Sequence, residues 1–347
     1  MGVTADGLTR ARFVARLLGA RVRGRPHTLS HLVTSRCNGR CPTCLWRDQA
    51  GAELDTATVV WLYGEAGRLG LAQLVAWGGE PLLRDDLPAL LAAAKRAGLV
   101  VTLISNGWLI EERWPELRGC VDTLILSLDD VGPAHDRLRG LPGLYDRLEA
   151  FAQRLRHDPQ RPLLLVNTVL SRENRGALER VAPVARRWGA GLYFCAMETG
   201  GMEAAGFVDR LGLLALPPDE LSAAARQARK LKDAGYPLLA TRAFLHLLER
   251  DPGLTGYRCR GPHSLLTVEP DGAVRDCRRR DVSLADVDEL RVSGRGLASV
   301  LALPRRRELL AEAGSCTACN NPDVVEMSWL WDLRPAMLEK VVELAGR

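Results

Sequence analysis

Six short runs of aliphatic and β-branched residues alternate with helix-like segments between residues 29 and 195, and this alternation constrains the fold most. The expected strands are 29–34, 74–77, 100–104, 123–128, 163–170 and 191–195. The expected helices between them are 56–69, 88–97, 111–117, 144–155 and 175–188. Successive strands that are joined through helices form a parallel sheet with right-handed crossovers. The sequence therefore predicts an α/β fold.

Small or polar residues follow every one of the six expected strands. The ligand site of a parallel sheet gathers at the carboxyl ends of its strands. A barrel with a purely structural role would not need such residues at all six ends, so we expect a functional site there. The segments concerned are 37–44, 78–81, 105–107, 127–130, 167–169 and 195–198.

Three cysteines, Cys37, Cys41 and Cys44, lie in the loop after the first strand at intervals of four and three. So tight a run cannot join its three thiols to one another by disulfides, but it can bind one compact metal centre. A four-iron cluster that is held by three cysteines keeps one iron open for another molecule. The chain has nine cysteines and no recognisable export signal, which favours metal binding or catalysis over a disulfide framework.

A second motif, Trp77-Gly78-Gly79-Glu80-Pro81, follows the second strand. Its two glycines let the backbone approach a ligand closely, and its carboxylate can receive an ammonium group. Alone it could equally be a plain turn. Together with the three-cysteine loop, it resembles the signature of the radical SAM enzymes. The resemblance implies that Cys37, Cys41 and Cys44 bind a [4Fe-4S] cluster with S-adenosylmethionine (SAM) on its open iron, and that the Gly-Gly-Glu-Pro motif binds the SAM amino group.

Further matches to this family extend through the expected barrel. Ser105-Asn106-Gly107 resembles the turn near the methionine and ribose groups. Ser127 and Asp129, followed by Arg139, resemble a run in which the arginine pairs with the SAM carboxylate. Asn167 and Met197 lie where relatives contact ribose and adenine, although ordinary capping of strand ends is an equal alternative for Ser127 and Asn167. The sequence departs from the family at Thr43, where an aromatic residue usually stands beside adenine, and Trp46 is a candidate to replace it.

Four more cysteines, Cys259, Cys277, Cys316 and Cys319, form a second group. A hairpin with Asp271-Gly272 at its turn would bring the first two close together, and the Cys-x2-Cys pair completes four thiolates. Zinc and an iron–sulfur cluster both accept this ligand set. The order resembles the "twitch" domain, a shortened SPASM domain, which implies an auxiliary [4Fe-4S] cluster for electron transfer.

Two residues near the sixth strand are candidates for direct contact with substrate. Cys195 could donate a hydrogen atom or a proton, although free cysteines are more often core residues. Glu198 is the best single candidate for an acid or base. By contrast, we expect Cys120 to be buried, and His31 and His135 to be structural.

The resemblance implies a partial (β/α)6 TIM-like barrel of the radical SAM type with a small Cys-rich C-terminal twitch/SPASM-like domain. The expected divisions are a basic N-terminal helix (1–26), the barrel (27–200), a helical connection (201–255), the auxiliary cluster domain (256–322) and a closing helix (323–347).

The implied activity is reductive cleavage of SAM to a 5′-deoxyadenosyl radical, which removes a hydrogen atom from a substrate. Our main expectation is net oxidation of a small-molecule biosynthetic intermediate, with the auxiliary cluster as electron acceptor. Three alternatives stay open: a peptide maturase of the RiPP or sulfatase type, a lipid- or isoprenoid-modifying enzyme and, outside enzymes, a zinc-stabilised binding protein.

The composition bounds the partners. The hydrophobic content of 47% and charged content of 26% are those of a soluble globular protein, and no apolar run approaches the length of a membrane span. We therefore expect a cytoplasmic enzyme. The net charge is +5, and most of the basic residues are arginines. We do not take this charge as a sign of nucleic-acid binding, and we expect no nucleic-acid partner. Residues 7–47 contain no acidic residue, which is typical of a solvated basic helix; the alternative is docking to an acidic electron donor such as flavodoxin or ferredoxin, or peripheral membrane contact.

Overall fold

The structure is a computed structural model in which residues 5–44, 51–197, 212–277, 282–316, 319 and 322–345 are described. A nine-stranded sheet in the order β6-β5-β4-β3-β2-β1-β7-β8-β9 organises the molecule. Its first six strands in sequence are parallel, as predicted: β1 (Thr28–Thr34), β2 (Gln73–Gly78), β3 (Val100–Ser105), β4 (Thr123–Ser127), β5 (Leu163–Leu170) and β6 (Gly191–Ala196).

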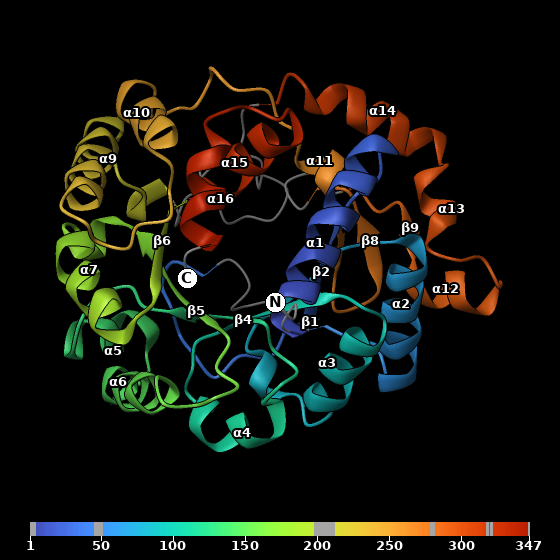
Figure 1. Ribbon diagram of the computed structural model, residues 1–347, viewed down its shortest axis with the longest axis horizontal. Helices are drawn as coiled ribbons and strands as arrows, with labels where there is room; N and C mark the ends of the chain where they lie inside the picture. The colour runs from blue at the N-terminus through green and yellow to red at the C-terminus, as the bar shows by residue number, and fades with distance from the viewer. Residues whose placement is uncertain are drawn as a thin grey trace.

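Helices follow these strands and cover one face of the curved sheet (Figure 1). They are α2 (Thr56–Leu69), α3 (Leu87–Arg96), α4 (Ile110–Leu117), α5 (Pro133–Arg139), α6 (Leu144–Leu155) and α7 (Ala177–Trp188), with short 3-10 turns at η1 (Pro81–Leu83) and η2 (Arg172–Asn174). Helix α5 was not expected from the sequence. Asp55 caps α2 by accepting a hydrogen bond from the Thr58 amide at 2.8 Å.

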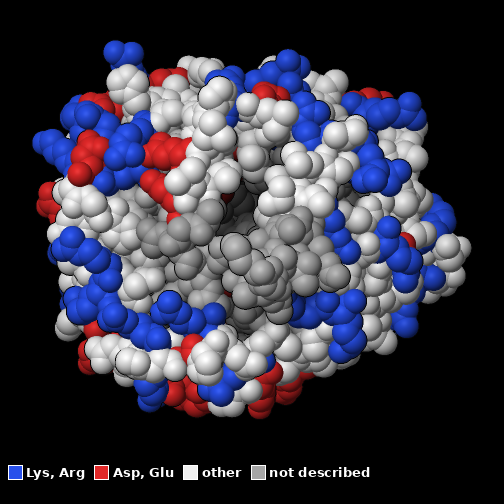
Figure 2. All heavy atoms as spheres, viewed as in Figure 1, with Lys and Arg blue, Asp and Glu red and all other residues white. Residues whose placement is uncertain are grey.

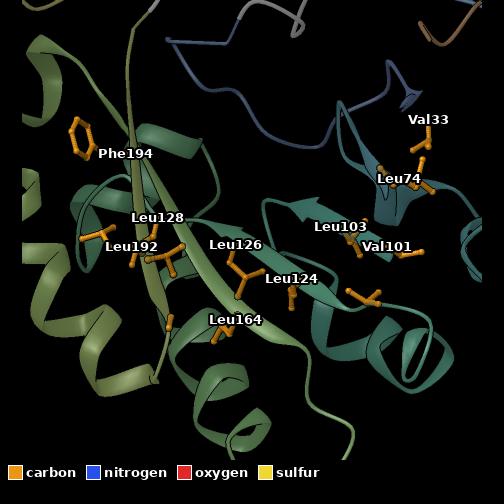
Figure 3. Close-up of a cluster of buried hydrophobic side chains, with 14 of the residues drawn as sticks. Val33, Leu74, Val101, Leu103, Leu124, Leu126, Leu128, Leu164, Leu192 and Phe194 are labelled. Atoms are coloured by element: carbon orange, nitrogen blue, oxygen red, sulfur yellow. The ribbon is translucent and has the colours of Figure 1, made fainter. Parts of the chain in front are cut away.

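The strands alternate between a fully buried outer face and a half-buried inner face. Leu103, Leu124, Leu126 and Phe194 belong to the outer set, which packs against the helices and forms the main core (Figure 3). The inner set in β4 is Thr123, Ile125 and Ser127, all half-buried. Burial of the outer face fixes the register of each strand, because a slip by one residue would turn the aliphatic side chains inward.

The C-terminal part continues the same sheet. Strand β7 (Leu265–Val268) pairs in parallel with β1, and β8 (Ala273–Arg275) pairs antiparallel with β7, which confirms the expected hairpin. Strand β9 (Ala285–Asp286) completes the edge. The positive φ of +94° at Gly272 explains the glycine at the hairpin turn.

The remaining helices lie before β1 and after β6 in the sequence. They are α1 (Ala5–Val22), α9 (Pro218–Asp233), α10 (Arg242–Arg250), α11 (Gly261–Ser264), α12 (Val287–Val292), α13 (Ala298–Leu301), α14 (Pro304–Ala313), α15 (Pro322–Trp331) and α16 (Met337–Ala345). The segment from 256 to 322, expected as the auxiliary cluster domain, therefore holds α11 to α14 as well as the hairpin. Ion pairs attach α16 to α9 and α10: Lys232 of α9 contacts Glu343 at 2.6 Å, and Arg242 of α10 contacts Glu339 at 2.7 Å.

No helix among the described residues is both long and apolar enough to cross a membrane.

Candidate radical SAM site

The three-cysteine loop begins directly after β1, and its thiols lie close to one another and form no disulfide. A Cβ on Gly39 would lie 3.6 Å from the Cys37 Sγ and 3.7 Å from the Cys41 Sγ, so these two sulfurs flank the glycine. Burial raises the pKa of the Cys37 thiol to about 11, with smaller contributions from Cys41 and Cys44. Burial also raises the pKa of Cys41. A metal centre must therefore displace protons from these thiols when it binds.

The glycines of the Gly-Gly-Glu-Pro motif lie against the backbone of this loop. The Gly79 amide donates to the Thr34 carbonyl at 2.8 Å, and the Glu80 amide donates to the Arg36 carbonyl at 2.8 Å. A Cβ would come within 2.3 Å of the Thr34 oxygen at Gly78 and within 2.1 Å of the Arg36 oxygen at Gly79. The sequence suggested that the glycines admit a ligand; in this structure they admit the cysteine loop itself.

Glu80 joins the ends of β2 and β3. Its carboxylate is fully buried and accepts hydrogen bonds from the Ser105 hydroxyl at 2.7 Å, the Asn106 amide at 2.7 Å and the Leu82 amide at 3.0 Å. Burial raises the pKa of Glu80, although these three donors oppose the shift. A carboxylate has about four acceptor positions, so roughly one is left for an ammonium group. Pro81 opens the 3-10 turn η1 that follows.

Asn106 reaches the cysteine loop from the other side. Its amide nitrogen donates to the Asn38 Oδ1 at 2.8 Å, and its own Oδ1 accepts from the Trp108 amide at 2.8 Å. Gly107 has a φ of +81°, and a Cβ there would collide with Leu148 at 2.3 Å. Asn38 was not among the expected site residues, since nothing in its local pattern distinguishes it from the rest of the loop.

Arg139 lies between Asp129 and the cysteine loop. Its Nε is 2.8 Å from the Asp129 carboxylate, and its Nη1 is 3.8 Å from the Cys41 Sγ. Its carbonyl accepts from the Arg40 amide at 2.8 Å. Burial alone would lower the pKa of Arg139, but the charges of Asp129 and Cys41 raise it overall. The guanidinium is thus held in place, with its positive charge at the thiols.

Asp129 and His135 stabilise the end of β4. The Asp129 Oδ1 accepts from the Val169 amide at 2.9 Å, and the Asp129 amide donates to the His135 Nδ1 at 3.1 Å. Burial lowers the pKa of His135 to about 3, so the ring is neutral. His31 is similar: it is fully buried, its Nδ1 lies 2.9 Å from the Tyr63 hydroxyl, and burial lowers its pKa to about 3. These contacts confirm the structural roles that we expected for both histidines.

The inner face of β5 and β6 supplies the remaining candidates. The Cys195 thiol donates to the Asn167 Oδ1 at 3.5 Å, and both side chains are half-buried. Ser127 is half-buried at the end of β4, whereas Met197 is buried. Thr43 is half-buried in the cysteine loop, while Glu198 and Trp46 lie outside the described residues. Figure 2 shows a hollow near the centre of the face that carries α1 and α16.

The four later cysteines lie at the ends of elements in the C-terminal part. Cys259 precedes α11, Cys277 follows β8, Cys316 follows α14 and Cys319 precedes α15. Cys259 and Cys319 are buried, and none of the four cysteines forms a disulfide. The predicted β7–β8 hairpin lies between the first two along the chain. Cys120 is half-buried rather than fully buried as expected, although it does pack against the core.

The donor chemistry of the three-cysteine loop fits an iron–sulfur cluster. No group of three His, Cys, Asp or Glu side chains within the described part of the chain is arranged to hold one metal ion. An iron–sulfur cluster takes one thiolate at each of several irons, so its ligands stand further apart. Three thiols in one loop, with the buried Arg139 guanidinium beside Cys41, match the ligands and the charge that such a cluster requires.

Comparisons with known proteins agree with this arrangement. Residues 32–182 match the family described as the radical SAM superfamily. The chain is 37% identical over 174 residues to the PqqA peptide cyclase of Gluconobacter oxydans, which covers 48% of each protein. It is 32% identical over 253 residues to the PqqA peptide cyclase of Ruegeria pomeroyi, which covers 71% of this chain and 66% of that relative. The chain thus spans about half the length of the first of these relatives.

Solved structures share the fold. SuiB of Streptococcus suis, bound to its precursor peptide SuiA, superposes with a TM-score of 0.67 at 16% identity, covering 92% of this chain and 75% of SuiB. The SuiB structure bound to SAM gives the same TM-score at 17% identity, covering 91% of this chain and 77% of SuiB. The chain belongs to the radical SAM superfamily, whose members use SAM and a [4Fe-4S] cluster. Membership sets aside the zinc-stabilised binding protein.

Proposed function

We propose that this radical SAM enzyme modifies a peptide. The observation that carries the proposal is the 32% identity to a PqqA peptide cyclase over 71% of the chain, which extends beyond the barrel residues that the whole superfamily shares. SuiB, whose fold is similar, binds a precursor peptide. Both findings favour the peptide alternative over our main expectation of a small-molecule substrate, and neither favours a lipid or an isoprenoid.

Cys37, Cys41 and Cys44 hold the cluster in this proposal, and SAM lies beside Glu80. The cluster and SAM together supply the radical that removes a hydrogen atom from the substrate. Glu80 offers its remaining acceptor position to the SAM amino group, and Arg139 provides positive charge beside Cys41. Gly78, Gly79, Pro81, Ser105, Asn106 and Asp129 keep these groups in position through the contacts described above. Ser127, Asn167 and Met197 are the proposed ribose and adenine neighbours.

Cys195 and Glu198 are the proposed substrate-facing residues. Cys195 is half-buried on the inner face of β6, where its thiol is held toward Asn167. A thiol in this position can deliver a proton or a hydrogen atom to a substrate held in the hollow. Cys195→Ala is expected to lower product formation while SAM cleavage in the absence of substrate stays unchanged.

The second group of cysteines is proposed to hold the auxiliary [4Fe-4S] cluster. Four thiolates complete the coordination of such a cluster, so its role is electron transfer rather than substrate binding. An acidic flavodoxin or ferredoxin is the proposed electron donor. The absence of acidic residues from 7 to 47 supports a contact with such a donor through α1, and the same stretch fits peripheral contact with an anionic membrane.

The test is anaerobic reconstitution followed by two assays. With SAM and dithionite, the wild-type protein is expected to form 5′-deoxyadenosine, and Cys37→Ala is expected to form none. Short peptides encoded next to the gene for this enzyme are then incubated with it, and the change in their mass is measured by mass spectrometry. Loss of hydrogen mass from one peptide supports the proposal. SAM cleavage without a change in any such peptide, together with turnover of a small molecule, would restore the small-molecule reading.

A further inference from the structure

The base of the cysteine loop is closed by an arginine that lies outside the motifs discussed so far. Arg84 follows η1, three residues after Pro81, and its side chain is only 6% exposed. We propose that Arg84 is a positioning residue that fixes both arms of the cysteine loop so that its three thiols are held ready for the cluster. This inference rests on the proposed cluster ligands.

Arg84 binds one backbone carbonyl on each side of the loop. Its Nη1 donates to the Val33 carbonyl at 2.8 Å, near the end of β1 and four residues before Cys37. Its Nη2 donates to the Leu54 carbonyl at 3.1 Å, where the chain returns toward α2. One rigid guanidinium therefore joins the entry and the exit of a segment of about 20 residues.

Asp86 fixes the direction of the guanidinium. The Arg84 Nε donates to one Asp86 oxygen at 2.8 Å, and Nη2 donates to the other at 2.7 Å. Asp86 also accepts from the Thr56 hydroxyl at 2.6 Å, which ties the pair to the start of α2. The planar fork of arginine can serve a carboxylate and two carbonyls at once, whereas the ammonium of lysine cannot reproduce that geometry.

A second set of contacts joins the same two arms of the loop, at the residues next to those that Arg84 binds. Glu53 accepts from the Arg36 Nε at 2.8 Å and from its Nη2 at 3.2 Å, and it also accepts from the Thr34 hydroxyl. The Leu54 amide donates to the Pro270 carbonyl at 3.0 Å, which attaches the exit of the loop to the β7–β8 turn. The arm before the cysteines and the arm after them are thus both fixed. Fixing the ends reduces the number of conformations that the loop must lose when its thiols bind iron.

The test compares Arg84→Gln and Arg84→Lys with Arg187→Gln as a matched control. Arg187 also holds a carboxylate with two nitrogens, Glu149 at 3.2 and 2.7 Å, but it does so between the outer helices α6 and α7. The first readout is the rate of iron release to a chelator after anaerobic reconstitution. The second is the change in the EPR spectrum of the reduced protein on addition of SAM, which reports on the cluster that SAM binds. The third is amide hydrogen exchange of residues 34–54 in the iron-free protein.

Arg84→Gln is expected to release iron about tenfold faster than wild type, at the low end of the effect of losing a residue that supports metal ligands. Amides of residues 34–54 should exchange faster, and the SAM-induced EPR change should shrink. Arg84→Lys should fall between the two, and Arg187→Gln should match wild type in all three readouts. Asp86→Asn, which keeps the guanidinium but loosens its direction, should show a weaker form of the same defect if Arg84→Gln fails to fold.

Wild-type iron release and loop exchange in Arg84→Gln would overturn the inference. The inference would also be overturned if Arg84→Gln and Arg187→Gln showed equal defects that scaled with the fall in their melting temperatures. Arg84 would then contribute only to general stability. Failure of the proposed function looks different. In that case wild type and Cys37→Ala would give the same EPR spectrum with SAM, whatever happens at Arg84.

Discussion

The buried ion pair between Lys340 of α16 and Glu326 of α15 offers a strong test of how the C-terminal helices are attached. The two charged groups are in direct contact, and Glu326 is 1% exposed. The Lys340 Nζ also lies 4.7 Å from the centre of the Tyr193 ring on the inner face of β6. Burial alone would lower the pKa of Lys340, but Tyr193 and Glu326 raise it overall, so the lysine stays charged at neutral pH.

Lys340→Met is expected to destabilise the protein because it leaves the carboxylate buried without its counter-ion. Removal of one partner of a buried pair costs about 3–5 kcal/mol. The Glu326 carboxylate also accepts a hydrogen bond from the Thr241 amide at 2.6 Å. Lys340→Met combined with Glu326→Gln removes both charges and keeps an acceptor for that amide. The double variant should therefore recover most of the loss and fall within about 1–2 kcal/mol of wild type.

The assay is urea unfolding of wild type, both single variants and the double variant at pH 7, followed by tryptophan fluorescence. Hydrogen exchange of α15 and α16 shows whether the helices detach before the barrel unfolds. A coupling energy of about 2 kcal/mol or more between the two substitutions is expected from the contact. If Lys340→Met costs less than about 1 kcal/mol, or if the single costs simply add, the pair does not anchor α16 in the way described here.

Three further predictions use the site and the core. Gly79→Ala should lose iron binding, because the new Cβ would lie 2.1 Å from the Arg36 carbonyl oxygen; Gly212→Ala, where a Cβ meets nothing within 4 Å, is the control measured beside it by iron analysis. Stability should fall as the pH drops from about 6.5 toward 3, since the pKa of His31 is lowered to about 3 and the unfolded chain then binds the extra proton; in urea unfolding, His31→Gln should reduce the slope of stability against pH by up to about 1.4 kcal/mol per pH unit, while His135 keeps its own contribution. Cys316→Ala should cleave SAM at the wild-type rate yet yield no modified peptide, and full product yield would exclude an electron-accepting role for the auxiliary cluster.

The six parallel strands could be predicted from the sequence to within one or two residues because their signal is local. Each strand is a short aliphatic run that ends at a small or polar residue, and the alternation with helices leaves little choice of topology. The members of the site could be predicted for the same reason, since strand ends of a parallel sheet share one edge. The function of the individual side chains needed the resemblance to a family, because spacing alone indicated only a metal centre with an open position.

Contacts between distant segments could not be predicted in this way. Arg84 binds carbonyls 51 and 30 residues away, and Asn106 binds Asn38 across 68 residues. No local pattern marks such residues. The glycines of the Gly-Gly-Glu-Pro motif show the same limit: their need for space was visible in the sequence, but the occupant of that space is the loop backbone. Helices α12 and α14 were not predicted, because the cysteines of that segment indicated loops around a metal centre.

The pairing of β7 with β1 has a consequence for the distance between the two proposed metal centres. β1 leads directly into the loop of Cys37, and β7 together with β8 lies between Cys259 and Cys277. β1 and β7 pair from Thr28 opposite Leu265 to His31 opposite Val268. Both cysteine groups are therefore attached to the same hydrogen-bonded part of the sheet. The Leu54–Pro270 hydrogen bond adds a second tie between the exit of the first loop and the turn of the hairpin. Electron transfer depends on a fixed separation, and a shared sheet provides one that a flexible linker between two domains would not.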